Sequence, residues 1–133
     1  MNARQNASLG SALTSANNGV NALSKSNNSI NSSANAIANG QPGNARLNAQ
    51  RAATNFGNAH RELTNASNKL NNLSRQMNNT NKAAANKLRT AAAYMKRAGV
   101  AAAQAKLAYS LVNIGKGLET MAGLNNVPKT PSV

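Results

Sequence analysis

The first forty residues look like a polar, asparagine-rich segment, yet their apolar side chains recur with a regular period. Successive spacings alternate between four and three residues over four repeats, which is the a/d heptad pattern of a helix that packs along one side. The pattern therefore predicts a helix over residues 1–39. Its seam consists of Leu9, Leu13, Ala16, Val20, Leu23, Asn27, Ile30, Ala34 and Ile37.

Asn27 is the one polar member of this seam. A single asparagine at an a position can set the register or the number of helices in a coiled coil, at some cost in stability. A chain this rich in asparagine also places one there by composition alone. Both interpretations stay open at the level of the sequence.

A break in the pattern follows at 40–44. Gly40 can end a helix, and Pro42 cannot continue one. A second run with the same alternating spacing then begins, and it predicts a helix of matched length that returns antiparallel to the first. The seam of this second run consists of Phe56, Ala59, Leu63, Ala66, Leu70, Leu73, Met77, Thr80 and Ala84.

The second helix is expected to be long, covering 45–125, with an extended, proline-containing tail at 126–133. Its weak point is Asn78–Asn81, because asparagine side chains compete for backbone hydrogen bonds. A kink near 78–82 would preserve one long helix, whereas a full break there would give three helices.

Composition favours thin helix packing over a thick globular core. Aromatic residues make up 2 % of the 133 residues, and alanine is abundant. Many helix positions are Asn, Ser or Gly, each costing up to about 0.7–1 kcal/mol relative to Ala, so an isolated copy should be marginally stable. We therefore predict an all-α fold: a long antiparallel helical hairpin, coiled-coil-like, with an extended C-terminal helix, assembled in an oligomer.

Positive charge is abundant and unevenly placed. The chain has 15 Lys and Arg residues against two acids, with a net charge of +13, and eleven of these cations lie within 46–106. Five of them are separated by multiples of seven residues, which places them along one side of a continuous helix in steps of about 10.5 Å. This predicted stripe binds an anion or, alternatively, is a solvated outer face. The stripe consists of Arg61, Arg75, Lys82, Arg89 and Lys96, with Arg97, Lys69 and Lys87 beside it.

Catalytic chemistry has few candidates. The acid–base groups are His60, Glu62 and Glu119, and there is no cysteine. General acid–base catalysis uses such groups in pairs, and no phosphate-binding glycine loop or metal-ligand spacing occurs. We expect a non-enzymatic protein without cofactor or metal. Its expected partner is DNA or an acidic protein surface, because Lys and Arg without aromatic platforms favour phosphate-backbone contacts.

The segment 99–124 is the most apolar part of the chain and is rich in Ala and Gly. Such a surface allows close helix packing, either in the core of an assembly or against a membrane. A simple membrane-spanning helix is not predicted, because no run of about 18 uncharged apolar residues occurs.

The heptads at 9–37 and 56–84, followed by the apolar segment 99–124, resemble the small basic helical internal (ejection or core) proteins of short-tailed bacteriophage virions. The resemblance lies in composition and pattern over most of the chain. It implies a multi-copy virion protein, present in the host cytoplasm during assembly, that packs against genome DNA and is released with it. Helical-hairpin coat proteins of filamentous viruses also fit, and the alternatives are a nucleoid-type DNA-condensing protein and a membrane-interacting helical protein.

Overall fold

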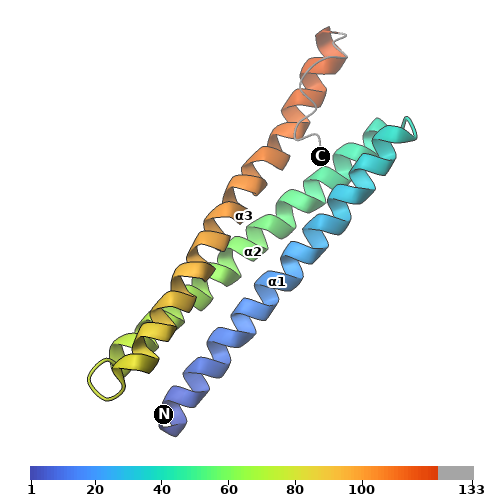
Figure 1. Ribbon diagram of the computed structural model, residues 1–133. Coiled ribbons are helices and arrows are strands. Elements are labelled where there is room, and N and C mark those ends of the chain that lie inside the picture. The colour runs from blue at the N-terminus through green and yellow to red at the C-terminus, as the bar shows by residue number, and fades with distance from the viewer. Residues whose placement is uncertain (123–133) are drawn as a thin grey trace. The chain divides into compact units, whose positions relative to one another are not determined.

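The computed structural model describes residues 1–122, with side chains to residue 110, and this part of the chain is all-α. Its helices are α1 (Ala3–Ala38), α2 (Pro42–Met77) and α3 (Lys82–Ala122), shown in Figure 1. The tail predicted at 126–133 lies outside the described residues, as do the side chains of the second half of the segment 99–124.

The helices contribute to two compact units. Unit 1 combines Met1–Asn21 with Asn58–Ala101, and unit 2 combines Ala22–Gly57 with the described chain from Ala102 onward. Each helix is continuous through the point where it passes from one unit to the other.

α1 starts with a reciprocal cap. The backbone N–H of Gln5 donates to the side-chain oxygen of Asn2 (2.8 Å), and the backbone N–H of Asn2 donates to the side-chain oxygen of Gln5 (3.1 Å). This arrangement satisfies two backbone donors that the first turn of a helix leaves without an intrahelical partner.

The α1–α2 connection uses the Gly/Pro signals of the sequence. Gly40 has φ of +68°, and its N–H donates to the carbonyl of Ile37, while the N–H of Gln41 donates to that of Ala36. These two bonds form a Schellman motif, which needs a left-handed residue that glycine provides without steric cost. Helix α2 starts at Pro42, three residues before the predicted start at 45, because proline suits the first helical position.

The prediction of one helix over 45–125 is wrong, because the chain makes a full break at Asn78–Asn81. The N–H groups of Thr80 and Asn81 both donate to the carbonyl of Met77, the last residue of α2. Asn81 then caps α3, since its side-chain oxygen accepts from the N–H of Ala84 at 3.1 Å. The asparagine run therefore reverses the chain rather than kinking a helix.

Unit 1 is a three-helix arrangement with a thin apolar core. One cluster joins Ala12 of α1, Leu70 of α2 and Ala92 of α3, and a second joins Leu73, Met77 and Ala85. The predicted seam of α2 is its buried face. The seven buried members are Phe56, Ala59, Leu63, Ala66, Leu70, Leu73 and Met77.

Most of the predicted seam of α1 lies off its buried face, although Ala16 is buried and Leu9 packs against the core. Leu13, Val20 and Ile37 are more than half exposed, at 53 %, 56 % and 54 %, and Asn27 is also exposed. The buried face of α1 instead carries small residues at seven-residue intervals. These are Ala12, Gly19, Ser26 and Ser33.

Small side chains occupy the buried face of α1 because they let two helix backbones approach closely. A Cβ added to Gly19 would lie 2.7 Å from Cγ of Leu63. In unit 2 the hydroxyls of Ser26 and Ser33 donate to the carbonyls of Ala52 and Ala45, at 3.1 and 2.7 Å. These polar groups are therefore buried without losing a hydrogen bond, which a pattern based on large apolar residues does not anticipate.

Unit 2 contains the aromatic contact of the described chain. The rings of Phe56 and Tyr109 stack with centroids 5.7 Å apart and an interplanar angle of 26°. Burial raises the pKa of the Tyr109 phenol, because desolvation disfavours its ionised form.

Candidate functional site

The candidate site lies on the α2–α3 hairpin of unit 1, whose register is set by polar contacts. Ser67 donates its hydroxyl proton to the carbonyl of Ala92, and Ser74 donates to that of Ala85, both at 2.8 Å. Each seven-residue step forward along α2 is thus matched by a seven-residue step backward along α3. The helices are antiparallel with a constant register over these contacts.

His60 continues this series one step further along the hairpin. Its Nδ1 lies 2.8 Å from the carbonyl oxygen of Gly99, so it can donate there in the tautomer that carries the proton on Nδ1. A Cβ on Gly99 would meet Oγ1 of Thr64 at 3.3 Å, so the helices are also close at this step. His60 therefore has a packing role that accounts for its position beside Arg61.

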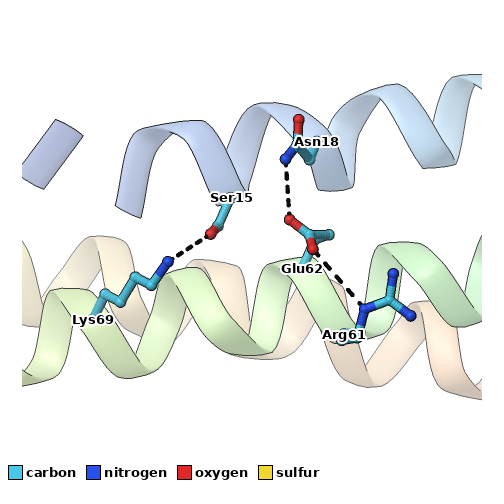
Figure 2. A network of polar contacts seen from close by, with 5 residues as sticks. All are labelled: Ser15, Asn18, Arg61, Glu62 and Lys69. Carbon is cyan, nitrogen blue, oxygen red and sulfur yellow. Dashed lines mark hydrogen bonds and ion pairs between the residues drawn. The ribbon is translucent and has the colours of Figure 1, made fainter. Parts of the chain in front are cut away.

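Helix α1 covers one side of the hairpin through a polar network, shown in Figure 2. Lys69 donates to the hydroxyls of Ser11 and Ser15 at 2.9 and 3.0 Å. Asn18 donates to Glu62 at 3.2 Å. Lys69, expected beside the basic stripe, is therefore directed to α1 instead.

The other side of the hairpin carries the basic residues. Arg61 and Arg75 each follow a contact residue of α2, and Arg89 of α3 reaches across to the hydroxyl of Ser74 at 3.2 Å. The opposite side of α3 packs toward α1, because Ala91 and Met95 belong to the cluster that contains Ala12. Lys82 and Lys96 are each seven residues, or about two helical turns, from Arg89. They therefore lie on the same face of α3 as Arg89.

We call this surface the basic face; it consists of Arg61, Arg75, Lys82, Arg89 and Lys96, all exposed. The predicted ladder along a single helix is wrong, because the break at Asn78–Asn81 divides it between α2 and α3. The antiparallel return nevertheless brings the two parts together. Along the axis of the hairpin, Arg75 of α2 lies beside the stretch of α3 between Lys82 and Arg89. Arg61 lies about 21 Å from Arg75 along α2, beside Lys96 of α3.

The charge of the basic face has little internal compensation. Glu62 is the one acid of unit 1, whereas nine of the 15 cations lie there. Glu62 pairs with Nε of Arg61 at 3.9 Å. The guanidinium groups of Arg75 and Arg89 donate to uncharged amide oxygens, those of Asn72 and Asn86. These contacts orient the guanidinium groups without neutralising them.

Lys82 adds to the positive potential near the turn. As the first residue of α3, it lies at the end of the helix where the macrodipole is positive. A lysine there works against helix stability, because its charge has the same sign as the dipole at that end.

Arg97 lies beside the basic face on the outer surface of α3. Its Cζ is 4.8 Å from the ring centroid of Tyr94, which is 61 % exposed. This cation–π contact holds the guanidinium on the helix surface.

Apolar periodicity does not identify the residues that build the hairpin: Ser67, Ser74 and their acceptor residues Ala85 and Ala92. Their signal is present, because serines seven residues apart on α2 match alanines seven residues apart on α3. Apolar periodicity does not reveal it because serine is counted as polar, although a hydroxyl that donates to a neighbouring carbonyl can be buried.

Within the described residues, no group of three or more His, Cys, Asp or Glu side chains could hold a metal ion. None of the described helices is long and apolar enough to cross a membrane. The chain matches none of the protein families, curated proteins or solved structures with which it was compared.

Proposed function

We propose that the protein is a non-enzymatic structural or assembly component of a virion that contacts genome DNA through the basic face. One observation carries the proposal: two antiparallel helices place five exposed cations on one side, and the single acid of unit 1, Glu62, pairs with only one of them, Arg61. A surface that serves only solubility normally mixes both signs, because acid–base pairs also support the helix. An external polyanion is the partner that such a face fits.

Duplex DNA fits this face better than a single strand does. Binding of single strands relies on aromatic side chains that stack on the bases, and the basic face has none. By helical phase, Asn68 and Asn71 of α2 lie beside the cations of the basic face, and their amides can donate to phosphate oxygens. The expected binding is therefore independent of sequence and sensitive to salt.

The assembly part of the proposal rests on the low intrinsic stability of the helices and on the resemblance to internal virion proteins. A thin core in which Ala and Ser outnumber the large apolar residues gives each copy little apolar burial, so neighbouring copies would supply stabilising contacts. We therefore propose a multi-copy, coiled-coil-like assembly that can leave the virion with the genome.

The test is DNA binding by the triple variant Arg75→Gln, Lys82→Gln and Arg89→Gln. Its control has the same charge loss in unit 2, at the exposed positions Lys25, Arg46 and Arg51. Fluorescence anisotropy with a labelled random duplex should give a slope of log affinity against log salt that is shallower by roughly three in the triple variant.

The control variant should keep a slope close to that of the wild type. Equal losses in both variants would mean that total charge, and not the basic face, drives binding. Circular dichroism of both variants provides the check that the helices persist.

A further inference from the structure

Helix α1 carries an apolar stripe that the rest of the described chain leaves largely uncovered. Leu13, Val20 and Ile37 are each more than half exposed. Leu23 and Ile30 are half-buried at the edge of the same stripe. We call these five residues the α1 stripe.

The α1 stripe follows a heptad that the described chain uses only in part for its own packing, at Leu9 and Ala16. The contacts of α1 with α2 run through Gly19, Ser26 and Ser33, which lie on a neighbouring face of the helix. A spacing of four and three residues is the pattern that lets a helix pack along another helix. The stripe therefore has the periodicity of a helix–helix contact without a partner in the described chain.

The charge distribution indicates which partner covers the stripe. Arg4 and Lys25 are the only charged residues of α1, whereas the other 13 cations lie elsewhere in the chain. Two copies that each carry a net charge of +13 repel each other least when they meet through α1. DNA, an acidic protein and an anionic membrane would all favour a surface with more cations than this one.

Asn27 supports the same partner. It lies between the apolar members of the stripe and is exposed. A side-chain amide both donates and accepts hydrogen bonds, so Asn27 can pair with Asn27 of another copy. Parallel, in-register pairing brings the two Asn27 residues together and lets the stripe pair over its whole length, whereas an antiparallel pair centred on residue 27 would leave the N-terminal part of the stripe unpaired.

We propose that two copies of this chain associate through the α1 stripe, with their α1 helices parallel and Asn27 facing Asn27. This contact defines the surface used in the multi-copy assembly of the proposed function, but it does not depend on DNA binding. In unit 1, the basic face lies on the side of the hairpin away from α1, so it stays available for the anion.

The first test is sedimentation equilibrium of the full chain without DNA. The double variant Leu13→Gln and Val20→Gln should shift the chain to monomer and raise the dissociation constant at least tenfold. Both residues are exposed, so each copy should keep its helical circular dichroism. The control variant Asn21→Gln and Asn28→Gln has the same spacing on an exposed neighbouring face and should associate like the wild type.

The orientation is tested by disulfide formation, for which a chain without native cysteine is a clean background. Parallel pairing predicts that Leu13→Cys gives a covalent dimer on mild oxidation, because facing a positions come within disulfide range. Asn21→Cys, off the stripe, should stay largely monomeric.

A wild type that is monomeric at micromolar concentration, or association that survives the glutamine double variant, would overturn the proposal. So would a monomeric wild type whose flotation with anionic vesicles is abolished by that double variant, since a membrane would then cover the stripe. The triple variant of the basic face should still dimerise. Loss of DNA binding with intact dimerisation thus separates the two proposals.

Discussion

At the scale of single residues, the helix contacts are made by small side chains. Gly19 allows α1 to approach Leu63, and serine hydroxyls donate to carbonyls of the neighbouring helix at Ser67 and Ser74. These contacts supply less apolar burial than leucine would, but they are specific in position. A glycine or serine moved by one residue would lose its partner, so the small residues set the register.

Gly19 and Gly10 provide a matched pair of substitutions in α1. A Cβ at Gly10 meets nothing within 4 Å, so Gly10→Ala should raise the free energy of unfolding by about 0.5–1 kcal/mol through helix propensity. A Cβ at Gly19 would overlap the buried Leu63 side chain. The free energy of unfolding of Gly19→Ala should therefore be about 1–3 kcal/mol lower than that of Gly10→Ala. Urea titrations followed by circular dichroism measure this difference.

Equal stability of the two alanine variants would contradict this close approach of α1 to α2. Protein concentration must be the same in both titrations, because self-association also contributes to apparent stability.

At the scale of elements, the two connections end their helices by different means. The first uses the left-handed Gly40 and then Pro42, which are strong local signals. The second contains neither residue and has no positive φ. It depends on the Asn81 cap and on the contacts that hold α3 against α2, such as the Ser74 bond to Ala85.

Substitution of the cap tests how much the second connection depends on it. Asn81→Ala removes the acceptor for the N–H of Ala84 and should lower the free energy of unfolding by about 0.5–2 kcal/mol. Asn79→Ala, at an exposed position of the same turn, should change it by less than about 0.5 kcal/mol. Thermal and urea unfolding of both variants provide the measurement, and a larger effect at Asn79 would contradict the assignment of the cap.

At the scale of the whole molecule, the large positive charge governs how the protein interacts with other copies and with polyanions. Fifteen cations and two acids give the chain a net charge of +13, so copies repel one another unless counterions or a polyanion screen them. The proposed DNA contact and the proposed α1 pairing should therefore respond to salt in opposite directions.

Raising NaCl from about 50 to 500 mM should weaken DNA binding by several orders of magnitude, because the entropy gained by releasing counterions falls as the bulk salt concentration rises. Over the same range the dissociation constant for self-association should fall, since screening reduces the repulsion while apolar burial remains. Anisotropy and sedimentation on one preparation measure both trends. Weaker self-association at high salt would indicate that ion pairs, and not the α1 stripe, join the copies.

Local features of the sequence determined that the chain is helical, where its first turn lies and which face of α2 is buried. These follow from periodicity, Gly40 and Pro42, and from large apolar residues whose burial needs no particular partner. The sequence also marks the cations of the basic face, because their seven-residue spacing is a local property of each helix.

Only the tertiary structure decided that α3 turns back on α2 and which face of α1 is buried. A run such as Asn78–Asn81 permits either a kink or a reversal, and the packing of Ala85 and Ala92 against α2 selects the reversal. On α1, hydroxyl-to-carbonyl bonds and close backbone approach favour the small-residue face over the leucines. Both outcomes depend on residues distant in sequence, which helical periodicity alone cannot pair.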